Sequence, residues 1–132
     1  MKHSPVLEFQ SSAFPIAPGE DEATNPRIYG KALAQWLASQ LRAAGVPAGD
    51  VIPEDFGWCI RVASRPHLLY VACAGFGEPP DCWRVFAFAE RGVMARLLGR
   101  DRSAESVASL FAAVRRCLES TPAVRGLREE TE

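Results

Sequence analysis

The sequence predicts an α+β fold, a two-layer sandwich in which two helices cover one face of an antiparallel sheet of four to six strands. Three observations support this fold class. Segments with the two-residue alternation of strands surround two segments with the three- and four-residue spacing of amphipathic helices. The connections between the later strands are short, which favours antiparallel pairing. Two amphipathic helices each need an apolar partner, and one sheet face serves both.

The length and charge of the chain restrict its organisation and its partners. A chain of 132 residues suits a single domain, and we expect it to span 1–132 with frayed ends at 1–5 and 128–132. The formal net charge is −1, and acidic and basic residues are balanced in both halves of the chain. Nucleic-acid binders usually carry a basic excess. We therefore expect no nucleic-acid partner.

The N-terminal part of the chain predicts one strand and one helix. Apolar and polar side chains alternate over residues 6–14, as in a sheet with one solvated face. An acidic loop at 19–22 follows, and its negative charge is favourable near the next helix N-terminus. Asn25 and the proline after it suit the start of that helix. Its apolar stripe, which includes Leu33, ends before Gly45.

The rest of the chain predicts three strands, a helix and an edge strand. Strands are expected at 58–63, at 68–74, which is apolar on both faces and therefore central, and at 82–90. Residues 93–98 fit either a short strand or a helical turn. We expect a second helix to begin at Ser103 and to end before Pro122. Its buried stripe would consist of Val107, Leu110, Phe111, Val114 and Leu118. An edge strand is expected at 123–127.

The four cysteines, at positions 59, 73, 82 and 117, predict free thiols in a cytoplasmic protein. They form no Cys-x-x-Cys pair, and with only two histidines they do not make a zinc pattern, so we expect no metal and no cofactor. A contact between Cys59 and Cys73 stays open. Pro5 and Glu8 interrupt the early apolar run of a signal peptide. No apolar stretch approaches the roughly 20 residues that span a bilayer, so no membrane partner is expected.

The most unusual segment is 50–58, in which carboxylates stand beside large aromatic residues. We expect a turn here, with Pro53 setting its first backbone angle. Neighbouring carboxylates point apart when extended, so they do not share a metal or a proton. An acidic and aromatic recognition edge is the functional interpretation, and its candidate binding residues are Asp50, Glu54, Asp55, Phe56 and Trp58.

Three patterns related to catalytic or phosphate-binding sites are incomplete. His67 and Cys73 are six residues apart on one expected strand, or roughly 20 Å when extended. Cys59 could approach His67 across a hairpin, but the sequence supplies no orienting acid or oxyanion donors. The loop Gly75–Gly77 lacks the lysine and the following helix of a phosphate-binding loop. We therefore assign no catalytic residue.

A resemblance points in the same direction. The run Ile52-Pro-Glu-Asp-Phe-Gly-Trp58 before a strand, the later Cys82-Trp-Arg-Val85 and a terminal helix resemble small uncharacterised bacterial α+β proteins. Some similar proteins act as immunity proteins that block a toxin of a neighbouring cell. The likeness covers the pattern of residues 25–127 and carries no catalytic residue. It implies an interaction protein.

We therefore expect a protein that binds without catalysing a reaction. Its partner would be a protein, with basic character to match the acidic segment, and a homodimer through an uncovered sheet face is a related hypothesis. The alternative is a small-molecule-binding domain or an enzyme. Its pocket would lie between the sheet and the helices, lined by Trp36, Trp58 and Trp83 with Arg61 or Arg84 pointing inward.

Overall fold

The computed structural model describes residues 2–62, 68–90 and 103–130, and it confirms the predicted α+β sandwich. Its helices are α1 (Lys31–Ala43) and α3 (Ser103–Glu119), preceded by a short 3-10 helix, η1 (Glu20–Glu22). Its strands are β1 (Lys2–His3), β2 (Val6–Gln10), β3 (Ala48–Glu54), β4 (Gly57–Val62), β5 (Leu68–Ala74), β6 (Cys82–Glu90) and β7 (Arg125–Glu130).

All strand pairs in the described sheet are antiparallel. The strand order is β3-β4-β5-β6-β2-β7, and the two-residue β1 also pairs with β6. The three central hairpin strands follow one another in sequence, as their short connections predict. The N-terminal strand β2 instead lies between β6 and β7, so the two ends of the chain complete one side of the sheet.

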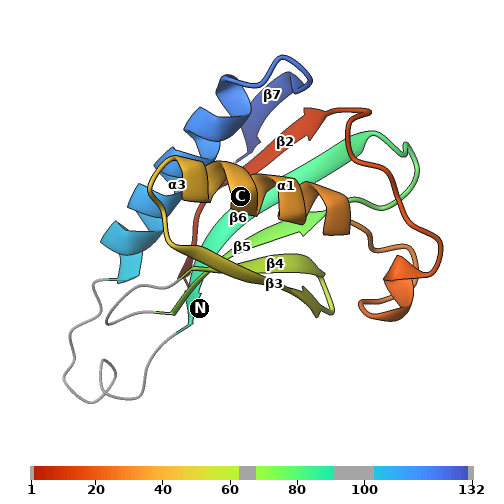
Figure 1. Ribbon diagram of the computed structural model, residues 1–132, viewed down its shortest axis with the longest axis horizontal. Helices are drawn as coiled ribbons and strands as arrows, with labels where there is room; N and C mark the ends of the chain where they lie inside the picture. The colour runs from red at the N-terminus through yellow and green to blue at the C-terminus, as the bar shows by residue number, and fades with distance from the viewer. Residues whose placement is uncertain (1, 63–67, 91–102, 131–132) are drawn as a thin grey trace.

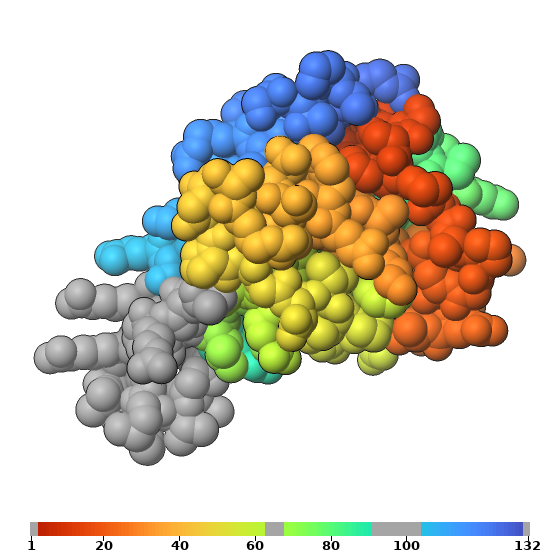
Figure 2. All heavy atoms as spheres, in the orientation of Figure 1, coloured from red at the N-terminus to blue at the C-terminus, as the bar shows by residue number. Residues whose placement is uncertain are grey.

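Both helices lie on the same face of the sheet (Figure 1). Figure 2 shows this side of the molecule, with α1 and α3 next to each other over the strands. The predicted stripe of α3 is buried against the sheet, apart from the half-buried Phe111. In α1, Leu33, Leu37 and Leu41 are buried and Trp36 is half-buried. The core contains the helix residues Leu33, Leu37, Leu41, Leu110 and Val114 and the sheet residues Leu7, Trp58, Ile60, Val71, Trp83 and Val85.

Helix α1 begins at Lys31, and the prediction of a start at Asn25 is wrong. The capping group is the carboxylate of Glu20, which is only 8% exposed. It accepts hydrogen bonds from the backbone N–H groups of Gly30 at 3.0 Å, Lys31 at 3.1 Å and Ala17 at 2.8 Å. The acidic loop therefore places negative charge at the helix N-terminus, as the sequence predicted.

The segment from Ala48 to Glu54 is the edge strand β3, where the sequence predicted a turn around Pro53. Pro53 pairs with Trp58 across the β3–β4 hairpin. An edge strand tolerates proline because one of its sides needs no backbone donor. The turn itself is confined to Asp55 and Phe56.

The outer strands also differ from the prediction in length. Strand β2 ends at Gln10, four residues before the expected end at residue 14. Strand β7 covers 125–130, although the sequence predicted an edge strand at 123–127 and a frayed end from 128. The strands expected at 68–74 and 82–90 are confirmed, and 68–74 is central. The ambiguous segment 93–98 lies outside the described residues.

Candidate functional site

The face of the sheet away from the helices, called the open face below, divides into two halves. On β3 to β6 it carries an aromatic half, and on β6, β2 and β7 it carries a charged half. The members of the aromatic half are Ile52, Phe56, Tyr70, Phe86 and Phe88. The members of the charged half are Glu8, Arg84, Arg128 and Glu130.

The aromatic half is a continuous layer of rings. Tyr70 and Phe88 are register partners on β5 and β6, and their rings stack with centroids 5.1 Å apart. Phe86 and Phe88 lie on the same face of β6, and their ring centroids are 5.9 Å apart. Arg84, Phe86 and Phe88 share this face because alternate residues of a strand point the same way.

Phe56 reaches this layer from the turn between β3 and β4. Its ring stacks on Phe86 with centroids 6.3 Å apart and meets Phe88 edge-on at 5.8 Å. It nevertheless stays 41% exposed. The turn therefore folds one large ring over the open face, where that ring is both anchored and accessible.

The charged half is a network of ion pairs centred on Glu8. One carboxylate oxygen of Glu8 lies 2.8 Å from Arg84 Nε, and the other lies 2.7 Å from Arg128 Nη2. Glu130 lies 3.5 Å from both arginines. Partial burial raises the pKa of Glu8, but the hydrogen bond from Arg128 and the charge of Arg84 outweigh it, so the pKa is lowered. The positive charge of Arg84 is therefore already balanced.

The structure separates the candidate binding residues of segment 50–58. Asp50, Glu54, Asp55 and Phe56 are exposed. Trp58 instead faces the helices and is only 6% exposed. Its ring packs in the core, and its N–H has no hydrogen-bond acceptor among the described residues.

The side chain of Lys31 lies over the helix-facing ring of Trp58, with Nζ 5.3 Å from its centroid. This placement is that of a core tryptophan at a sheet–helix boundary. Trp58 therefore takes no part in the open face.

The sequence pattern did not identify Tyr70 as part of the site, because the strand 68–74 is apolar on both faces. Phe76 was also missed, although it lies in the β5–β6 loop with 49% of its surface exposed. The available signal was the pairing of large aromatics on the solvent-facing positions of 82–90. A strand with aromatics on its polar side indicates that its neighbours also carry apolar groups there.

The buried thiols have environments that suppress nucleophilic chemistry. Burial, with a smaller contribution from the charge of Glu54, raises the pKa of Cys59 to about 12. Burial also raises the pKa of Cys73 well above its usual value. The two thiols lie on opposite faces of the sheet, because Cys59 pairs with Ala72 and Cys73 pairs with Trp58. Both groups are protonated at neutral pH, in which state a thiol is a poor nucleophile.

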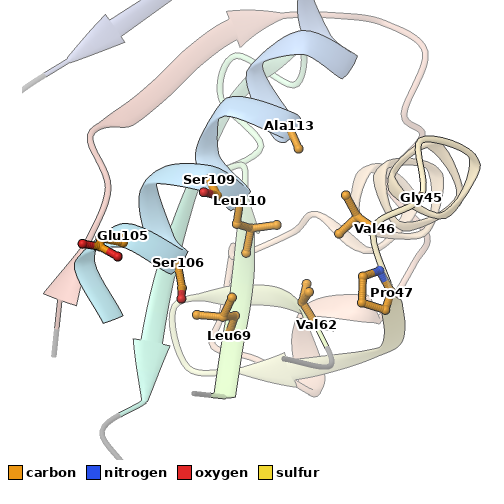
Figure 3. A pocket seen from close by; sticks show the side chains of 10 residues that line it. All are labelled: Gly45, Val46, Pro47, Val62, Leu69, Glu105, Ser106, Ser109, Leu110 and Ala113. Carbon is orange, nitrogen blue, oxygen red and sulfur yellow. The ribbon is translucent and has the colours of Figure 1, made fainter. Parts of the chain in front are cut away.

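A pocket of about 490 Å³ opens between the C-terminal end of α1, helix α3 and the ends of β4 and β5. Figure 3 shows Val46, Val62, Leu69 and Leu110 around the opening, while the carboxylate of Glu105 points away from it. Among the described lining residues, the other polar side chains are the serine hydroxyls. These described residues include no pair of groups placed for acid–base or nucleophilic chemistry.

The three tryptophans of the alternative hypothesis do not line this pocket. Trp58 and Trp83 are buried in the core, and Trp36 packs on Phe14 with ring centroids 5.2 Å apart. Arg84 points away from the helices, on the open face. Within the described ranges, no three His, Cys, Asp or Glu side chains gather as metal ligands would.

Neither described helix is long and apolar enough to cross a membrane. Comparisons of the chain with protein-family models, with curated proteins and with solved structures find no match. An assignment of function therefore depends on the chemistry of the described surface.

Proposed function

We propose that this protein binds another protein through the aromatic half of its open face and catalyses no reaction. The observation that carries this proposal is the position of Phe56, which is anchored on two other rings and yet exposed. Large aromatic side chains at the centre of a patch contribute most to protein binding, because they bury much surface with little loss of side-chain freedom.

The charged surroundings fit the same proposal. Glu54 and Asp55 adjoin Phe56, and Glu90 accepts a hydrogen bond from the Tyr70 hydroxyl at 3.4 Å. An apolar centre with a charged rim is the usual anatomy of a protein interface. The resemblance to small bacterial immunity proteins adds a role to the proposal, namely that the partner is a protein whose activity this chain blocks.

The test compares two variants of the open face with one variant of the helix side. Tyr70→Ser and Phe56→Ser each remove a ring from the aromatic half, whereas Gln35→Ser changes an exposed residue of α1. Each variant is first checked for folding by circular dichroism. Proteins captured by the wild-type chain from the native host should bind to Gln35→Ser and should be lost by both ring variants.

A captured partner is then purified and titrated against the wild-type chain by calorimetry. Burial of the rings should give a negative heat-capacity change on binding, and Tyr70→Ser should make this change less negative. The proposal fails if folded ring variants bind every specific partner as tightly as the wild-type chain does. It also fails if the purified chain turns over a substrate at its α1–α3 pocket.

A further inference from the structure

Next to the aromatic half, the open face contains a hollow of about 350 Å³. Two exposed aromatic residues line it: Phe56, from the β3–β4 turn, and Phe76, from the β5–β6 loop. Ile28, from the segment before α1, also lines it. The other lining residues are His3, Val6, Ala74, Arg84 and Phe86. Three loops therefore each contribute an apolar side chain to the hollow, namely Ile28, Phe56 and Phe76. The segments that carry these residues lie at the same end of the sheet (Figure 1).

Hydrogen bonds between the loops fix the walls of the hollow. Tyr29 and Gly75 exchange two backbone hydrogen bonds of 2.8 Å, which join the Ile28 segment to the loop of Phe76. Asn25 donates from its side chain to the backbone oxygen of Asp55 at 3.0 Å, which joins the same segment to the turn of Phe56. A site whose walls are already ordered loses less entropy on binding.

Two glycines make this convergence sterically feasible. A Cβ at Gly30 would lie 2.5 Å from the backbone oxygen of Cys73, and a Cβ at Gly57 would lie 2.6 Å from the same oxygen. Both glycines have positive φ values, 146° and 152°. The segment before α1 and the end of the β3–β4 turn therefore approach the end of β5 more closely than any other residue would permit.

Carboxylates lie next to the walls of the hollow in the sequence. Glu54 and Asp55 directly precede Phe56, and all three are exposed. Glu78, also exposed, follows Phe76 by two residues. Arg84 lines the hollow, but Glu8 and Glu130 balance its charge. The surroundings of the hollow are therefore suited to positive charge on a ligand.

The size and shape of the hollow favour a side chain of a macromolecule over a free small molecule. Pockets for drug-sized ligands run from roughly 300 to 1,000 Å³ and enclose most of the ligand. This hollow is at the small end of that range and opens on a sheet face that bears the half-buried rings of Tyr70 and Phe86. An apolar side chain entering it would bring its neighbours near Phe56 and the two carboxylates that precede Phe56 in the chain.

We propose that the hollow between Phe56 and Phe76 receives an apolar side chain of a protein partner, and that Lys or Arg residues beside that side chain face Glu54 and Asp55. This inference rests on the proposed function and specifies the chemistry of the partner. The rings supply the apolar contact, and the carboxylates supply attraction that weakens as salt screens it.

The experiment uses a displayed library of random linear peptides as the probe and the wild-type chain as the bait. Enriched peptides should combine one aromatic or long aliphatic residue with neighbouring Lys or Arg. A synthetic copy of an enriched peptide is titrated against four proteins by fluorescence anisotropy at low and high salt. They are the wild-type chain and the variants Phe76→Ser, Glu54→Lys/Asp55→Lys and Leu68→Ser.

Phe76→Ser should weaken binding at least about tenfold, because Phe76 is a wall of the hollow. The Glu54→Lys/Asp55→Lys variant should bind the peptide more weakly, and its affinity should depend less on salt than that of the wild-type chain. Leu68→Ser is the matched control, because Leu68 is as exposed as Phe76, at 50% and 49%, but lies at the opposite end of β5. It should bind like the wild-type chain.

The inference is overturned if no peptide is enriched, if the enriched peptides lack Lys and Arg, or if Phe76→Ser binds them normally. It is also overturned if sedimentation shows a dimer that Phe76→Ser dissociates, since a second copy would then occupy the hollow. A native partner lost by Tyr70→Ser but retained by Phe76→Ser would contradict this inference alone. The proposed function would stand, because Tyr70 belongs to the aromatic half and not to the hollow.

Discussion

The strands of this sheet face α1 and α3 on one side and carry the open face on the other, and the two faces differ in the kind of side chain they carry. The helix-facing positions hold aliphatic residues and tryptophans, such as Val71, Trp83 and Val85, all nearly inaccessible to solvent. The open face holds stacked rings on one half and an ion-pair network on the other.

The difference shows which side chains the fold itself needs. A solvated face of an antiparallel sheet requires only polar groups, as the charged half illustrates with Glu8 and its arginines. Phe56, which is exposed, and Tyr70 and Phe86, which are half-buried, exceed that requirement. Exposed apolar patches bordered by charge indicate interaction sites. We therefore expect substitutions on the two faces to separate stability from binding, and the predictions below are ordered by the expected loss of stability.

The largest losses are expected at the helix–sheet interface. Leu33→Ala and Leu110→Ala should each lower the free energy of unfolding by about 2–5 kcal/mol, because both side chains are buried and leave a cavity. Gln35→Ala, on the exposed side of α1, is the control and should be nearly neutral. Denaturant melts give the comparison. Equal losses at Gln35 and Leu33 would mean that α1 does not pack as described.

Removing the buried cap of α1 should have the next largest effect. Glu20→Ala leaves three backbone N–H groups without the carboxylate that accepts their hydrogen bonds. The free energy of unfolding should fall by about 1–3 kcal/mol. Glu22→Ala removes an exposed carboxylate of the same loop and should change it by less than about 0.5 kcal/mol. If the cap does not stabilise the fold, the Glu20→Ala and Glu22→Ala variants should have the same free energy of unfolding.

On the open face, a ring should matter more for binding than for folding. Phe56→Ser should cost only about 1 kcal/mol of stability, because the ring is already partly solvated. The same variant should weaken a purified partner's affinity about tenfold or more. Chemical denaturation and calorimetry on one protein sample test both statements. A stability loss as large as that of Leu33→Ala would remove the distinction between the two faces.

The smallest effect is expected in the charged half. Glu8→Gln should lower the free energy of unfolding by at most about 1 kcal/mol at neutral pH, since exposed ion pairs are weak. The pKa of Glu8 is lowered in the folded state. Its contribution is therefore present above the unfolded-state pKa and is lost as the pH falls through the folded-state pKa. The wild-type and Glu8→Gln stabilities should converge in acid and in high salt, and a constant difference would argue against an ionic origin.

The periodicity of apolar residues correctly predicted those elements whose structure depends on residues close together in the chain. The helix stripes and the strands at 68–74 and 82–90 are where periodicity placed them. Strand β3 was read as a turn, because Pro53 and two adjacent carboxylates are typical of turns. Only its position at the sheet edge makes that proline acceptable, and edge position is a property of the assembled sheet.

The candidate site was predictable only in part for the same reason. Glu54, Asp55 and Phe56 are neighbours in sequence, and the sequence identified them. Tyr70 and Phe76 come to the same surface through strand pairing and loop contacts between residues far apart in the chain. Trp58 is two residues from Phe56 but faces the opposite side of the sheet, because the turn at Asp55 and Phe56 ends before it.

The position of β2 between β6 and β7 has a consequence for synthesis on the ribosome. Strand β2 has no described sheet partner until residues 82–85 emerge, and its second partner is β7. The apolar side chains of Leu7 and Phe9 therefore have no strand beside them until β6 has been translated. Cotranslational folding can begin with the β3–β6 meander and α1, but closure of the sheet comes after the last strand leaves the ribosome.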